Sequence, residues 1–205
     1  MRIRSLAALL VLTACRRGDA PPATIDQARA KSSGESVIVE GVVTVPSGVI
    51  DAGFAIADET GGIYVAADST TRYRSDQVVR VTGTLSDNHG LLVVTPTSIA
   101  AADGHPRARV TAGPASIVGE RSEGSLVETT GTVTGPVVDD RPYGWKITIR
   151  DATGALLVFV PVGARIDVSG IRAGQRLRVR GFSGQYDDHH EILPRSQKDI
   201  VVLDS

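Results

Sequence analysis

The chain has 205 residues, enough for one large or two small domains. Its 22 basic and 23 acidic side chains give a net charge of −1. This balance argues against a protein that tracks a nucleic-acid backbone, because such proteins normally carry a clear basic excess. A single cysteine leaves no partner for a disulfide within the chain.

The first 15 residues have the order of a bacterial export signal. Arg2 and Arg4 precede an apolar stretch over residues 6–14. That stretch is shorter than the roughly 20 residues that a membrane-spanning helix needs. It ends in Leu-Thr-Ala-Cys, which resembles the lipobox of bacterial lipoproteins, where the cysteine is lipidated and becomes the first residue after cleavage.

This resemblance implies a signal peptide over 1–14, lipid such as palmitate on Cys15, and a tether over 15–22. Arg16 in place of aspartate after the cysteine implies an outer-membrane location facing the periplasm. Lipidation also consumes the one thiol, which excludes a cysteine nucleophile and a thiolate metal site. The alternative is an ordinary signal peptide, with the sole cysteine at this position by chance.

An internal duplication accounts for most of the remaining chain. Residues 58–65, Asp-Glu-Thr-Gly-Gly-Ile-Tyr-Val, match residues 151–158, Asp-Ala-Thr-Gly-Ala-Leu-Leu-Val. Residues 40–44 match 130–134, and residues 77–83 match 175–181. The segments leading into the two copies align as 23–25 with 115–117. The offset grows along the chain, as expected if the second copy gained residues in two loops.

Each copy has the chemistry of five short strands. β-Branched and alternating apolar runs are typical of strands, and Asp-x-Thr-Gly is typical of the turn between two of them. Asp58 and Asp151 are expected to start these turns, and Gly61 and Gly154 to supply a positive φ. The fifth strands are expected at 91–94 and 191–193, and the loop 163–175 is expected to plug the second barrel.

Five strands with a glycine after the first predict an all-β protein of two tandem OB-like barrels. Each copy is similar to the exported OB-fold modules found beside bacterial secreted nucleases and in envelope lipoproteins. The resemblance covers residues 23–103 and 114–205, with a linker over 104–113. It implies a binding module and no reaction.

Two features of the second copy are candidate binding residues. Arg176, Arg178 and Arg180 alternate along one strand, so their guanidinium groups share a face and suit phosphate or carboxylate. The alternative is a solvated face paired with neighbouring acids. Tyr143 and Trp145 open a long strand, where they either stack on a ligand or cap the barrel.

The sequence Asp-Asp-His-His-Glu over 187–191 invites comparison with a metal site. Residues 86–90 hold a similar Asp-x-His turn in the first copy. Neighbouring strand residues point to opposite faces, so His189 and His190 are poorly placed to share one ion. We therefore expect exposed turns, no metal and no cofactor. No catalytic motif is visible, so we expect no enzymatic activity.

These observations predict a lipid-anchored, non-catalytic envelope protein. Its expected partners are the membrane, through the lipid, and another envelope protein or an anionic polymer. The alternative is an OB-fold module that binds single-stranded nucleic acid at the cell surface, which net charge disfavours. Removing Arg2 and Arg4 with the signal leaves 20 basic and 23 acidic side chains.

Overall fold

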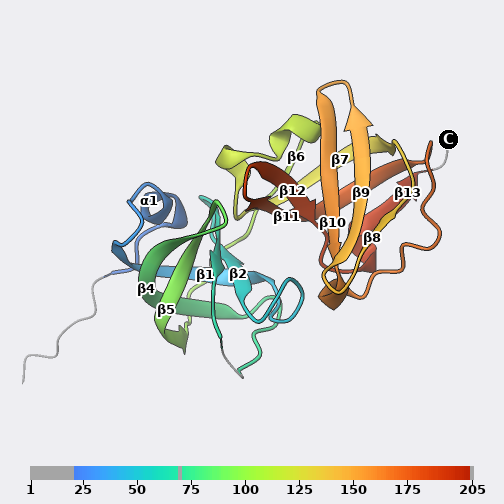
Figure 1. Ribbon diagram of the computed structural model, residues 1–205. Coiled ribbons are helices and arrows are strands. Elements are labelled where there is room, and N and C mark those ends of the chain that lie inside the picture. Colours follow the sequence, from blue (N-terminus) through green and yellow to red (C-terminus); the bar gives the residue numbers. More distant parts are fainter. Residues whose placement is uncertain (1–20, 69–70, 204–205) are drawn as a thin grey trace, which may run out of the picture.

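A computed structural model describes residues 21–68 and 71–203 (Figure 1). Cys15 and Arg16 lie outside the described residues. The described chain forms two closed five-stranded β-barrels. This confirms the predicted fold class. No helix within the described ranges combines the length and apolar character needed to cross a membrane.

Barrel one is closed in the strand order β1-β2-β3-β5-β4. The parallel β3–β5 pair and the antiparallel β1–β4 pair give the OB arrangement. A short helix, α1 (Ile25–Arg29), precedes it, capped by Thr24 and Gln27. The strands are β1 (Ser36–Val45), β2 (Phe54–Ala57), β3 (Gly62–Val65), β4 (Val78–Asn88) and β5 (Leu91–Ala101).

Barrel two repeats this order, and pairing of β11 with β7 closes it. Its five strands are β7 (Leu126–Val133), β9 (Gly144–Asp151), β10 (Gly154–Pro161), β11 (Arg176–Tyr186) and β12 (His189–Leu193). Three short strands extend the sheet: β6 (Val110–Ala112), β8 (Val138–Asp140) and β13 (Ile200–Leu203). Thus β6 forms within the expected linker and pairs with β7. Four 3₁₀ turns complete the described chain: Ala115–Ile117, Glu120–Ser122, Val162–Ala164 and Gln197–Asp199.

Strand registers reproduce the alignment of the two copies. Glu40 lies opposite Arg80 in barrel one, and Thr130 lies opposite Arg178 in barrel two. These are the positions that the sequence blocks equate. The loop after β10 also buries Ile166, Val168 and Ile171 in the core of barrel two, as a plug does.

The Asp-x-Thr-Gly turns tie each barrel to the segment that leads into it. Asp58 accepts hydrogen bonds from the amides of Thr60 and Ile25, at 2.8 and 2.9 Å. Asp151 accepts them from Thr153 and Ala115, at 2.7 and 2.6 Å. The equivalent of Ile25 is therefore Ala115, which shifts the sequence alignment of the lead-in segments by two residues.

One expectation about these turns is wrong. Gly154 has a φ of +149°, whereas the φ of Gly61 is not in the positive region. The turn after β9 is a tight hairpin in which Asp151 pairs with Gly154. In the first copy, the pairing of β2 with β3 ends at Ala57 and Gly62, so Asp58 and Gly61 lie just outside it. Gly61 adopts no left-handed backbone conformation in this turn.

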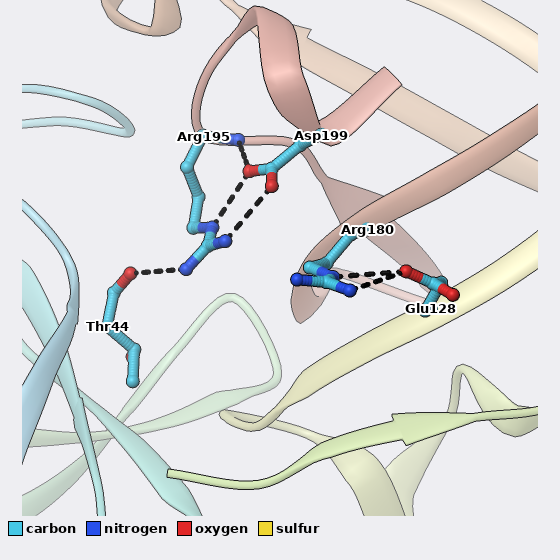
Figure 2. A network of polar contacts seen from close by, with 5 residues as sticks. All are labelled: Thr44, Glu128, Arg180, Arg195 and Asp199. Carbon is cyan, nitrogen blue, oxygen red and sulfur yellow. Dashed lines mark hydrogen bonds and ion pairs between the residues drawn. The ribbon is translucent and has the colours of Figure 1, made fainter. Parts of the chain in front are cut away.

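The two barrels pack directly on each other. A shared apolar cluster joins Tyr64, Val93 and other side chains of barrel one to Phe182 and Leu193 of barrel two. Arg29 and Glu123 form a 2.8 Å ion pair whose glutamate side chain is 1% exposed. The Arg195 guanidinium, held by Asp199, also donates to the carbonyl of Thr44 at 2.9 Å (Figure 2).

Candidate ligand-binding cleft between the barrels

A pocket of about 670 Å³ lies where the two barrels meet, and we call it the inter-barrel cleft. In each barrel, the loop joining the first two strands contributes residues to it. The turns joining the last two strands also lie there, and His89 lines the cleft from barrel one. These loops, with the second and third strands, are where OB folds bind ligands. The charged or aromatic lining residues are Asp51, Tyr64, His89, Asp140, Tyr143, Lys146, Phe159, Phe182, Tyr186, His189 and Glu191.

The turns that join the last two strands of each barrel contact each other at one side of the cleft. The Asp187 amide donates to the His89 carbonyl at 2.7 Å. The His89 ring stacks on Tyr186, with centroids 4.9 Å apart and an 18° angle between planes. The cleft thus has an aromatic wall built from both copies.

Two tyrosines leave large ring areas open to solvent. Tyr143 is 72% exposed and Tyr186 is 50% exposed. Phe182, in contrast, is buried against Tyr64, with ring centroids 5.9 Å apart. Exposed rings beside buried ones give the cleft a stacking surface on a rigid apolar base.

Glu191 is the buried acid of the cleft, only 8% exposed. It lies on β12 directly opposite Gly184 of β11, which has no side chain to cover it. Alternation along the strand sends Ile192 into the core and returns Leu193 to the shared cluster. Burial raises the pKa of Glu191 to about 7, against opposing effects of the His189 and Lys146 charges.

The other acids of the cleft already have partners. Lys146 Nζ lies 2.9 Å from Asp140 Oδ2. The hydroxyl of Tyr64 donates to Asp51, and burial, followed by the Asp51 contact, raises the Tyr64 pKa far above its usual value. With Lys146 so paired, the cleft offers few free cations for phosphate groups.

The three arginines predicted as a binding site lie outside the inter-barrel cleft. Arg176, Arg178 and Arg180 are exposed along β11, and their shared face is as predicted from the spacing. Arg180 donates to Glu128 at 2.8 Å (Figure 2). No ion pair joins Arg176 or Arg178 to another residue in the described part of the chain.

The two predicted aromatic residues are separated. Tyr143 belongs to the inter-barrel cleft, whereas Trp145 packs partly on the core of barrel two. Trp145 also lines a second depression of about 700 Å³ with Ile171 and Arg172. Tyr143, just before β9, and Trp145, on β9, therefore lie at different surfaces.

The two Asp/His turns and the strand residues beside them supply the cleft with His89, Tyr186, His189 and Glu191. From the sequence, these turns were considered only as a metal site or as exposed turns. Across residues 21–68 and 71–203, no three His, Cys, Asp or Glu side chains gather as a metal site. The useful signal was Glu191 itself, a charged residue directly followed by Ile192 and Leu193 in a core strand.

Comparison with known proteins gives fold-level likeness only. No protein-family model and no curated sequence matches the chain. Among solved structures, it is similar to a murine DNA-binding protein bound to double-stranded DNA, at 12% identity and TM-score 0.42 over 82% of this chain and 97% of that one. It is also similar to the Thermus aquaticus single-stranded DNA-binding protein, at 13% identity and TM-score 0.30 over 85% and 95% of the two chains.

These comparisons contradict the predicted envelope-protein or anionic-polymer partner, because the neighbours are described by the DNA that they bind. That interpretation is withdrawn. Identities this low bring no ligand to this chain by themselves.

Proposed function

We propose that this protein binds single-stranded nucleic acid in the inter-barrel cleft. The observation that carries the proposal is the placement of two exposed rings, Tyr143 and Tyr186, at a cleft formed by the ligand-binding loops of both barrels. Single-stranded nucleic acids bind OB barrels by stacking bases on such rings. Each stacked base contributes roughly 1–3 kcal/mol by alanine substitution.

The charges of the cleft favour contacts to bases over contacts to phosphates. Its cation, Lys146, is bound to Asp140, and Glu191 and Asp51 are also acidic. The salt dependence of binding reports the number of neutralised phosphates, with a log–log slope of about −0.7 per contact for single strands. We therefore expect a shallow slope, corresponding to about one or two contacts.

We further propose that the barrels are exported and held at the bacterial envelope by lipid on Cys15. The support is the sequence of the first 15 residues, in which the sole cysteine ends a lipobox-like run. Arg16 favours the outer membrane over the inner one. In this arrangement the cleft meets nucleic acid outside the cytoplasm.

Fluorescence titration of a labelled mixed-sequence single-stranded oligonucleotide tests the binding proposal. Tyr143→Ala and Tyr186→Ala are each expected to weaken binding by roughly fivefold or more, from the lost stacking. Val202→Ala on β13 removes exposed apolar surface outside the cleft and serves as the matched control. Absence of binding at low salt, or equal binding by all three variants, contradicts the proposal.

A further inference from the structure

Glu191 is the one acid lining the cleft that is both buried and without a close partner among the described residues. Its nearest ion-pair contact is His189 Nε2, at 4.0 Å. Asp140 and Asp51 are bound by Lys146 and Tyr64. Gly184, opposite Glu191 on β11, adds no side chain beside its carboxyl, and Glu191 lines the cleft. Such a group can accept hydrogen bonds from a ligand bound in the cleft that it lines together with Tyr143 and Tyr186.

The chemistry of a carboxylate selects among bases. Its two oxygens form a fork that accepts two parallel hydrogen bonds. The Watson–Crick edge of guanine presents two adjacent donors, the ring N1–H and the exocyclic amino group. Cytosine and adenine place one amino donor beside a ring-nitrogen acceptor, and thymine flanks one N–H with two carbonyls. A carboxylate repels each of those acceptors, so guanine alone satisfies both oxygens.

We propose that the inter-barrel cleft recognises guanine, with the carboxylate of Glu191 bonding the N1–H and amino group while Tyr143 or Tyr186 stacks on the base. This inference rests on the proposed function and adds the identity of the base. A well-formed bidentate contact discriminates against a wrong base by roughly tenfold or more. Because the contact is to the base, it also agrees with the few free cations of the cleft.

The protonation state of Glu191 gives the proposal a second signature. Its pKa of about 7 means that the accepting carboxylate is the minor form at pH 6 and the major form at pH 8. The charged groups that set this balance are His189 and Lys146, which favour the carboxylate, and Asp140, which opposes it. His89, Asp51 and Asp187 also face this region from the neighbouring loops. Guanine affinity is therefore expected to rise by up to about tenfold from pH 6 to pH 8.

The experiment is a titration of the protein with labelled single-stranded oligonucleotides that carry one variable base in an otherwise identical thymine context. Guanine, inosine, adenine and cytosine are compared at pH 6 and pH 8. Inosine is the sharpest comparison, because it keeps N1–H and lacks only the amino group. We expect guanine to bind best, inosine to lose much of the gain, and the preference to grow at pH 8.

Glu191→Gln is the test variant, since it keeps size and burial while replacing one acceptor oxygen by an amide donor. It is expected to remove the guanine preference and its pH dependence. The matched control is Asp188→Asn in the same turn, where the carboxylate side chain is fully exposed. Thermal unfolding and retained thymine-oligonucleotide binding show that each variant is folded.

The outcomes separate the two proposals. Equal affinity for all four bases, or a guanine preference that survives in Glu191→Gln, overturns the guanine inference and leaves nucleic-acid binding in place. Failure to bind any oligonucleotide overturns both. Preference for guanine that disappears in Glu191→Gln but not in Asp188→Asn supports both.

Discussion

Arg29 and Glu123 form a buried ion pair 2.8 Å long that joins the helix before barrel one to the segment before barrel two. Glu123 Oε1 also accepts a hydrogen bond from the Leu92 amide at 3.1 Å. Loss of one partner leaves a buried charge without its counter-ion, which costs about 3–5 kcal/mol. We expect Glu123→Ala to lower the unfolding free energy by that order, measured by urea denaturation.

The double variant Arg29→Met/Glu123→Leu provides the control for this prediction. It removes both charges and keeps apolar volume, so it is expected to recover much of the lost stability. If Glu123→Ala and the double variant are equally destabilised, loss of packing rather than an unpaired charge explains the effect.

The two turn glycines give a matched pair of substitutions. Gly154→Ala places a side chain at φ +149°, a region that costs about 1–3 kcal/mol for residues other than glycine. A Cβ at Gly61 meets only ordinary contacts, the closer at 3.8 Å from Ile25. We expect a clear fall in unfolding free energy for Gly154→Ala and a change near zero for Gly61→Ala, both measured by chemical denaturation.

The raised pKa of Glu191 predicts that the stability of the folded protein depends on pH. Its pKa rises from 4.5 to about 7 on folding, so the folded state holds the proton over a range where the unfolded state has lost it. Stability from this group is therefore full below pH 4.5 and declines as pH rises to about 7, by a total on the order of 3 kcal/mol. Glu191→Gln is expected to flatten this decline in urea titrations between pH 5 and 8. A parallel decline in the variant assigns it to other groups.

Arg176, Arg178 and Arg180 lie outside the inter-barrel cleft, so they are expected to contribute little to oligonucleotide affinity. With the ligand held in the cleft, Arg176→Ser/Arg178→Ser/Arg180→Ser is expected to retain most oligonucleotide affinity and only to reduce the salt slope. Its stability should change little, since the exposed Arg180–Glu128 pair contributes at most about 1 kcal/mol. Loss of most affinity in this variant places the site on β11 instead.

Lipidation of Cys15 is tested by fractionation of cells that express the full chain. Cys15→Ala is expected to leave the protein unprocessed or to release it from membranes, because no thiol remains to carry the lipid. Density separation of the membranes tests the outer-membrane expectation that Arg16 supports. A processed Cys15→Ala protein that still sediments with membranes contradicts the lipid assignment.

Local sequence was enough to predict both barrels, because strand pairing in each copy follows from the same turn and the same apolar spacing. Registers such as Glu40 with Arg80 depend only on those local patterns. The cleft could not be found in this way. It depends on how the barrels pack, which brings His89 beside Tyr186 across 97 residues of chain. The sequence left open whether Trp145 stacks on a ligand or caps the barrel, and its packing on the core of barrel two agrees with the second alternative. Strand alternation does not relate its direction to that of Tyr143, because Tyr143 precedes β9.

The contact between Gly62 and Gly124 makes the packing of the two barrels directional. A Cβ on Gly62 would lie 2.0 Å from the Gly124 carbonyl oxygen, so this contact tolerates only glycine. The position equivalent to Gly62 in barrel two is Ala155, and the equivalent of Arg29 is Gly119. A head-to-tail interface can in principle propagate into a filament. Barrel two carries Ala155 and Gly119 at these positions, so it lacks both the close glycine contact and the arginine with which barrel one is held.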